Sequence, residues 1–166
     1  SLQEGWVALL AQRLADKGYP VEMINASISG ETTEGGRRRL PDLLKEHQPD
    51  TVLIELGGND GLRGYPLNRL RGNLSRMASM ARGAGATVLI LPMEIPPNYG
   101  SRYATGFRDS FSAAARESGA RLAPFILEDI ATQPQLMQDD GIHPTREAQP
   151  IIVETLLPFI LEALQE

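Results

Sequence analysis

The chain has 166 residues, of which 42% are hydrophobic and 22% are charged, which predicts one globular domain over residues 1–166 and excludes a disordered chain. Its 16 basic and 21 acidic side chains give a net charge of −5, which provides no basic surface for nucleic acid or an anionic membrane. The absence of cysteine excludes a disulfide framework and a cysteine nucleophile, and no apolar run approaches the roughly 20 residues of a membrane-spanning helix.

Amphipathic stretches alternate with short apolar runs along the chain. The first stretch, with Trp6, Leu9, Leu10 and Leu14 on one face, predicts a helix that ends near Gly18. Strands are then predicted at residues 21–26, 51–56, 87–93 and 121–125. Further helices are predicted at residues 33–46, 67–81, 103–114 and 152–160, the first of them turned or kinked at Pro41. This alternation predicts an α/β protein with a three-layer αβα sandwich around a parallel sheet.

Small polar segments follow the first two predicted strands. Residues 27–32 read Ser-Ile-Ser-Gly-Glu-Thr, and residues 57–61 read Gly-Gly-Asn-Asp-Gly. Because ligands bind beyond the carboxyl ends of parallel strands, the Gly30 N–H and the Asn59 amide would reach one edge and could stabilise an oxyanion. An ordinary strand-to-helix loop, capped by Ser29 or Thr32, and a glycine-rich turn explain the same residues without chemistry.

The second of the two histidines, His143, follows the acidic pair Asp139-Asp140 in a loop that contains glycine and proline. An Asp three residues before a His can accept the Nδ1 hydrogen and leave Nε2 free as a general base, a spacing that favours Asp140 over Asp139. A solvated acidic turn is one alternative, and a metal site of Asp139, Asp140 and His143 is another, although their spacing matches no recognised zinc or iron site. His47 precedes a predicted strand and belongs at the opposite edge of the sheet.

Together, these segments resemble the SGNH (or GDSL) hydrolases, in particular the bacterial branch of thioesterase I, lysophospholipase L1 and arylesterase enzymes. Residues 25–30, 55–64 and 138–144 are similar to the second, third and fifth sequence blocks of that family. The resemblance implies a flavodoxin-like parallel sheet, oxyanion donors at Gly30 and Asn59, and triad residues Asp140 and His143. It also implies a mobile loop at residues 60–65 beside an acyl groove. The groove would be lined by Asp60, Leu62, Arg63, Tyr65, Ile95 and Pro96.

The Gly-Asp-Ser block that carries the nucleophile in this family does not occur in the sequence. Ser27 and Ser29 lie in the block that supplies an oxyanion donor, and Ser1 lies too far before Trp6, so none is assigned as the nucleophile. We expect an upstream serine on a first strand that lies between residues 21–26 and 51–56 in the sheet. Without that strand, unpaired backbone groups should leave the chain unstable alone.

The resemblance therefore implies a serine hydrolase of small-molecule acyl thioesters, lysophospholipids or aryl esters that uses no cofactor or metal. The resemblance further implies a monomer in the periplasm or outside the cell, without stable membrane insertion or nucleic-acid binding. One alternative is a non-catalytic α/β binding module on the same scaffold. Another is a flavodoxin-like nucleotide or receiver domain, for which the sequence shows no phosphate-cradling loop.

Overall fold

The computed structural model describes residues 2–165. Their packing divides the chain into two compact units. Unit 1 comprises residues 2–28 and 126–161, and unit 2 comprises residues 29–125 and 162–165. The organisation of the whole chain as one domain stays a prediction.

Unit 2 is built on a parallel sheet of three strands in the order β1-β2-β3. The strands are β1 (Thr51–Ile54), β2 (Thr87–Ile90) and β3 (Arg121–Leu122). Thr51 lies opposite Thr87 and Ile54 opposite Ile90, so the two Thr-Val-Leu-Ile segments run in register. Three of the four predicted strands are confirmed, although each is shorter than predicted.

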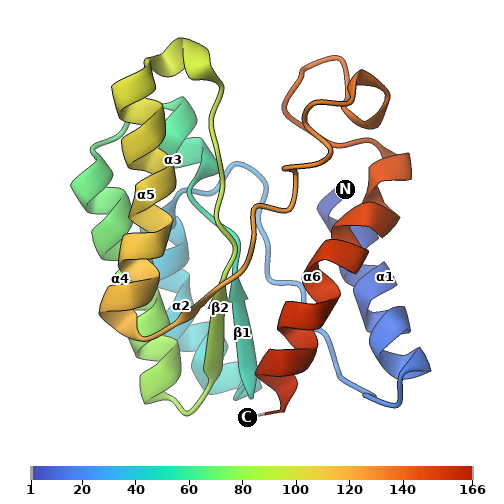
Figure 1. The fold of residues 1–166 in the computed structure, drawn as a ribbon. Helices are drawn as coiled ribbons and strands as arrows, with labels where there is room; N and C mark the ends of the chain where they lie inside the picture. Colours follow the sequence, from blue (N-terminus) through green and yellow to red (C-terminus); the bar gives the residue numbers. More distant parts are fainter. Residues whose placement is uncertain (1, 166) are drawn as a thin grey trace. The chain divides into compact units, whose positions relative to one another are not determined.

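The helices of unit 2 cover one face of this sheet. They are α2 (Thr33–His47), α4 (Leu67–Gly83) and α5 (Ser101–Ser118), with the short α3 (Gly58–Leu62) directly after β1. Helix α4 packs against α2, α5 and the sheet, and Figure 1 shows α2, α4 and α5 on the same side of β1 and β2. Helix α2 continues through Pro41, which removes one backbone hydrogen bond within the helix.

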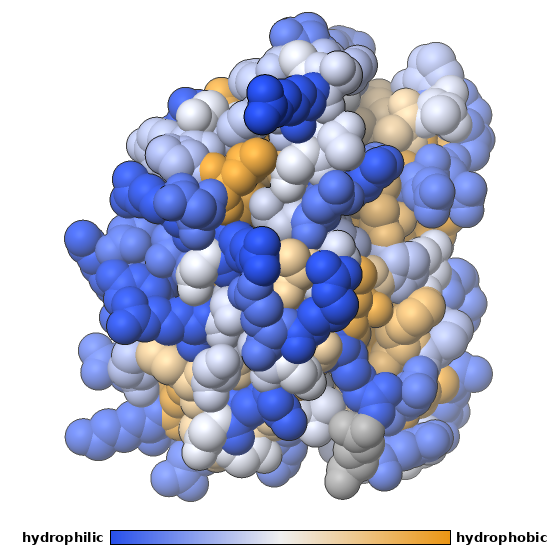
Figure 2. All heavy atoms as spheres, turned by 60° about the vertical axis from the view of Figure 1, so that its left-hand side comes forward, coloured by the Kyte–Doolittle hydropathy of each residue, from blue (hydrophilic) through white to orange (hydrophobic). Residues whose placement is uncertain are grey.

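The core of unit 2 lies between these helices and the sheet. Phe107 and Phe111 are completely buried, and their rings meet edge to face with centroids 5.2 Å apart. Leu70, Leu74 and Ile90 complete the centre of the same cluster. By contrast, the outward surface of the helices is mainly hydrophilic, with small separate apolar patches (Figure 2). This division is what the amphipathic spacing of α4 and α5 predicts.

Unit 1 contains two helices that lie side by side, α1 (Leu2–Asp16) and α6 (Gln149–Leu164) (Figure 1). Arg13 of α1 pairs with Glu154 of α6 at 2.8 Å. Leu10 and Leu14 of α1 and Leu156 of α6 are buried. None of the helices in the described part of the chain is long and apolar enough to cross a membrane.

The strand predicted at residues 21–26 is wrong, because this segment has no regular secondary structure. A strand needs a neighbour to receive its backbone hydrogen bonds. In the expected sheet order that neighbour is the first strand, and residues 2–165 contain no strand before β1. Ile24 is accordingly 48% exposed rather than buried.

Candidate active site

A tight turn in unit 1 holds the predicted acid–base pair. Met137 and Pro144 face each other in an antiparallel bridge, and the Gln138 N–H donates to the His143 carbonyl at 2.7 Å. Gly141 closes the turn with a φ of 67°, a conformation that favours glycine. The short hairpin therefore returns the chain on itself and brings the residues on either side of Gly141 together.

The Asp140 carboxylate contacts His143 at two places. Its Oδ2 lies 2.6 Å from the ring Nδ1, and its Oδ1 accepts hydrogen bonds from the backbone N–H groups of His143 at 3.0 Å and Ile142 at 2.9 Å. The hydrogen bond from the His143 side chain, followed by the two backbone hydrogen bonds, lowers the pKa of Asp140. An ionised carboxylate only accepts, so Nδ1 carries the hydrogen of this bond, and in a neutral ring Nε2 is then the acceptor.

The His143 side chain is 62% exposed, and its Nε2 has no partner among residues 2–165. The neighbouring Asp139 is exposed. In the part of the chain that the structure describes, no three His, Asp or Glu side chains form a group that could hold a metal ion. The spacing thus led to the observed partner of His143, Asp140, while the catalytic roles of both residues stay predictions.

The other predicted pair, Gly30 and Asn59, lies in unit 2 at the carboxyl end of β1. Gly57 has a φ of 121°, and a Cβ there would meet Phe111 Cζ at 3.0 Å, so the chain can turn against the core only at a glycine. This turn starts α3, from which the Asn59 Nδ2 donates to the Glu31 carbonyl at 3.3 Å. The amide of Asn59 therefore reaches the residue directly after Gly30, which is exposed and has a φ of 79°.

Asp60 does not line a groove as expected, because its side chain is only 3% exposed. Its two carboxylate oxygens accept hydrogen bonds from the backbone N–H of Thr33 at 2.8 Å and from the Thr33 hydroxyl at 2.6 Å. The negative charge of Asp60 also reaches Tyr103, where burial and then this charge raise the pKa of the phenol. Asp60 is thus committed to contacts inside unit 2.

Ile95 is likewise buried, at 8% exposure, and not open to a groove. It packs against Gly61 of α3, where a Cβ would lie 2.7 Å from Ile95 Cγ2 and 2.6 Å from Phe107 Cε2. An apolar residue after β2 was expected at the surface of the site, but the close approach of α3 covers it. Its neighbour Pro96 is half-buried, and its place in a groove stays a prediction.

The segment at residues 60–65 is held at several points in unit 2. The Tyr65 carbonyl accepts a hydrogen bond from the Tyr103 hydroxyl at 2.6 Å, and the Arg69 guanidinium lies 6.0 Å from the centre of the Tyr65 ring. The exposed Arg63 donates to the Gly30 carbonyl at 3.5 Å. Leu62 is half-buried. The roles of Leu62, Arg63 and Tyr65 in substrate binding stay predictions.

The serines considered as nucleophiles gain no assignment. Ser27 and Ser29 are exposed, and Ser1 lies outside the described residues. Thr32, in contrast, caps α2 by accepting from the Gly35 N–H at 3.4 Å, so the structural interpretation of this loop holds at that residue.

Three polar residues of unit 2 escaped the sequence analysis. Thr33 was predicted only as the start of a helix, yet it is fully buried between Asp60 and Asn73. Asn73 occupies one of the polar positions of α4, and nothing in the sequence pointed to its hydrogen bond with Thr33. Glu55, directly after β1, was quoted in the resemblance without a role, and burial raises the pKa of its carboxyl group to about 7. An acidic residue at the end of an apolar run was the available signal for Glu55.

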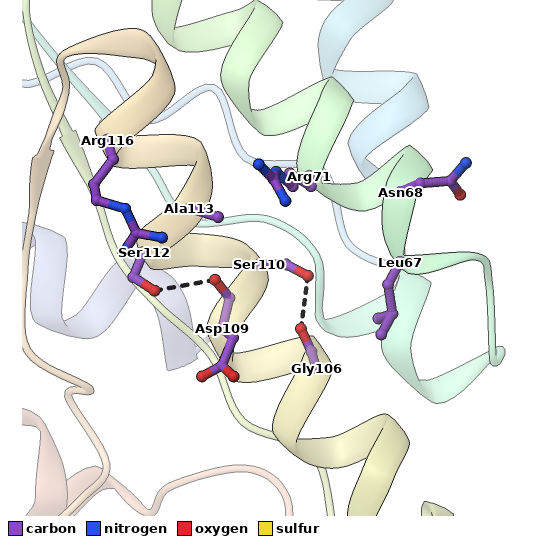
Figure 3. A pocket seen from close by; sticks show the side chains of 9 residues that line it. All are labelled: Leu67, Asn68, Arg71, Gly106, Asp109, Ser110, Ser112, Ala113 and Arg116. Carbon is purple, nitrogen blue, oxygen red and sulfur yellow. Dashed lines mark hydrogen bonds between the residues drawn. The ribbon is translucent and has the colours of Figure 1, made fainter.

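A shallow groove of about 610 Å³ between α4 and α5 lies apart from these residues (Figure 3). Its hydroxyl groups bond within their own helix, since Ser110 donates to the Gly106 carbonyl and Ser112 to the Asp109 carbonyl. Arg71 pairs with Glu117. The groove is lined by Leu67, Asn68, Arg71, Gly106, Asp109, Ser110, Ser112, Ala113 and Arg116. None of the predicted site residues is among them.

A carboxylate–imidazole pair on a turn, and a Gly–Asn pair at the carboxyl end of a parallel α/β sheet, are parts of the machinery of an acyl-transfer hydrolase. The chain belongs to the GDSL-like lipase/acylhydrolase family, whose sequence pattern it matches over residues 1–150.

Named relatives agree with this assignment. The chain is 51% identical to the esterase TesA of Pseudomonas aeruginosa, over 95% of this chain and 78% of the relative. It is 44% identical to the thioesterase 1/protease 1/lysophospholipase L1 of Escherichia coli, over 93% of this chain and 73% of the relative. The crystal structure of TesA superimposes with a TM-score of 0.92 at 50% identity, over 96% of this chain and 88% of that one. The protein is therefore a hydrolase of the SGNH family, and the predicted fold class is confirmed.

Proposed function

We propose that this protein is a serine hydrolase of acyl esters and thioesters that uses a Ser-His-Asp triad. His143 takes the proton of the serine hydroxyl as the serine oxygen attacks the acyl carbonyl. Asp140 orients the ring and stabilises the imidazolium that forms. The imidazolium then gives its proton to the leaving alcohol or thiol, and water releases the acyl group by the same route.

The oxyanion of the tetrahedral intermediate is held by the Gly30 N–H and the Asn59 amide. One hydrogen of that amide already bonds to the Glu31 carbonyl, which fixes the plane of the group and leaves its second hydrogen for the substrate. Donors fixed in advance stabilise developing charge without reorganising during the reaction. Residues 1–166 contain no Gly-Asp-Ser sequence, and the nucleophile of this proposal is a serine upstream of them.

The observation that carries the proposal is the 2.6 Å contact between Asp140 and His143. A surface histidine needs no carboxylate that is itself fixed by two backbone N–H groups. The substrate class is supported by the names of the relatives, which are an esterase and a thioesterase/lysophospholipase. Esters, thioesters and lysophospholipids share the acyl carbonyl that this chemistry attacks.

The experiment is the hydrolysis of a p-nitrophenyl acyl ester by the complete protein and by its His143→Ala variant. We expect near-complete loss of kcat, because His143 is the proposed general base that takes the serine proton. His47→Ala is the matched control. His47 is the last residue of α2 and precedes β1, so it lies at the amino end of that strand, and its replacement should leave activity unchanged. Full turnover by His143→Ala, or no turnover by the unaltered protein, would refute the proposal, and the second outcome would favour the binding module.

A further inference from the structure

Two segments of unit 2, the loop before α2 and the short helix α3, carry the proposed oxyanion donors, and a buried pair of side chains joins them. Gly30 lies three residues before Thr33, the first residue of α2. Asn59 lies directly before Asp60 in α3. The carboxylate of Asp60 bonds both the backbone N–H and the hydroxyl of Thr33, at 2.8 Å and 2.6 Å.

We propose that Asp60 and Thr33 are positioning residues that hold the Gly30 loop and the Asn59 amide in register for the oxyanion. This inference rests on the proposed function. Neither side chain touches the substrate in this role: both are buried, at 3% exposure for Asp60 and 0% for Thr33. They act through the donors that adjoin them in the chain.

The direction of the hydrogen bonds supports this role. The Thr33 hydroxyl accepts from Asn73 Nδ2 at 3.1 Å and therefore directs its own hydrogen to Asp60. Helix α4 packs against α2, α5 and the sheet. Through these hydrogen bonds Asn73 of α4 is connected to Thr33 of α2, and Thr33 to Asp60 of α3. These hydrogen bonds therefore tie both donor segments to α4.

The electrostatics also favour this pairing. The partners that bond the Asp60 carboxylate in the described part of the chain are neutral donors of Thr33. One of them is the backbone N–H of the first residue of α2, which has no acceptor within the helix. At this end the helix dipole also stabilises a negative charge. A buried carboxylate without hydrogen bonds is strongly unfavourable. The loop before α2 and helix α3 therefore cannot separate without leaving the Asp60 carboxylate exposed or without a hydrogen-bond donor.

A further bond shows that the loops already meet at the donors. The Asn59 Nδ2 bonds the Glu31 carbonyl at 3.3 Å, in the stretch between Gly30 and Thr33. The Asp60–Thr33 pair is only one to three residues from the donors along each chain segment. A small movement of Thr33 would therefore move the donors relative to the oxyanion. A displacement of about 1 Å in a catalytic group can lower the rate about 100-fold.

The test compares Thr33→Val, Thr33→Ser and Asp60→Asn in the complete protein, with kcat and KM measured on the same p-nitrophenyl ester. Thr33→Val keeps the shape but removes the hydroxyl, and it should lower kcat about 10- to 100-fold with little change in KM. Asp60→Asn should lower kcat to a similar extent. Thr33→Ser keeps the hydroxyl and should therefore have a kcat close to that of the unaltered protein. Ser118→Ala is the control. It also removes a buried hydroxyl, but this one bonds the Ala114 carbonyl in the last turn of α5 and not a residue beside the proposed donors.

A second arm asks whether Asp60 acts through Asn59. If it does, Asp60→Asn should lower kcat by a smaller factor in the Asn59→Ala background than in the unaltered protein, since coupled residues are not additive and only the Gly30 donor is left to be displaced. Unchanged kcat in Thr33→Val and Asp60→Asn would overturn the inference, as would a loss equal to that of Ser118→Ala at equal loss of stability. If Asn59→Ala itself leaves kcat unchanged, the oxyanion assignment in the proposed function fails instead.

Discussion

The carboxylate of Asp140 bonds both the ring and the backbone of His143, the ring at 2.6 Å and the N–H at 3.0 Å. The backbone bonds shape the turn, and the ring bond sets the tautomer, so one side chain serves the fold and the chemistry. These two contributions can be separated by substitution.

Asp140→Asn should separate them. The Asn side-chain oxygen can still accept from the backbone N–H groups of Ile142 and His143, so the turn should remain. The imidazolium loses its counter-charge, and the loss of such an Asp typically costs about 10⁴ in kcat. Ester hydrolysis measures the loss, and circular dichroism checks the fold. Asp139→Asn alters the exposed neighbour and should keep full turnover, whereas equal losses in the two variants would contradict the assignment.

Asn59→Ala should lower kcat with only a modest change in KM. The amide is expected to bond the oxyanion, which exists in the transition state and not in the bound substrate. Removal of one such donor typically costs about 10²–10³ in kcat, or roughly 2.7–4 kcal/mol. Steady-state kinetics at several ester concentrations separate the two constants. A variant that raises KM alone would show that Asn59 binds the ground state instead.

Gly61→Ala should destabilise the protein. Its Cβ would lie 2.6 Å from Phe107 and 2.7 Å from Ile95, both buried in the core. Overpacking of this kind typically costs about 1–3 kcal/mol in the free energy of unfolding, measured by urea denaturation. Gly72→Ala provides the comparison, because Gly72 is exposed within α4 and a Cβ there meets nothing within 4 Å. It should stabilise the protein by about 0.5–1 kcal/mol through helix propensity, and a loss of stability at Gly72 would contradict this account.

Glu55 should make stability depend on pH around neutrality. Burial raises the pKa of its carboxyl group from 4.5 to about 7 in the folded protein. Between these values the folded state holds a proton that the unfolded state has released, so stability falls as the pH rises through this window and then levels off. Glu55→Gln cannot ionise and should lose this dependence. The free energy of unfolding is measured at about pH 5 and about pH 8.

The control for this prediction is the exposed Glu128, whose change to Gln should keep the fall in stability between the two pH values. A parallel pH dependence in Glu55→Gln and the unaltered protein would show that another group is responsible. An increase in stability toward high pH that Glu55→Gln abolishes would reverse the sign and contradict the burial of the neutral carboxyl group.

Some of the site follows from local sequence. The hydrogen bond of Asp140 to His143 connects residues three apart on one turn, so spacing suffices to predict it. The strands β1, β2 and β3 follow from apolar runs because burial within a sheet requires such residues. Residues 21–26 also contain apolar side chains but form no strand, because pairing depends on a neighbour that composition cannot reveal.

The amino-acid sequence by itself determined the α/β class, the five longer helices and the local turn of the acid–base pair, since these depend on periodicity and on contacts between near neighbours. Only the tertiary structure decided that Asp60 and Ile95 are buried and that Asp60 bonds Thr33, 27 residues away in the chain. Polar and apolar residues in a glycine-rich loop look alike whether they face substrate or core. Which side they face depends on how closely α3 packs against Phe107, and that distance is set by side chains from distant segments.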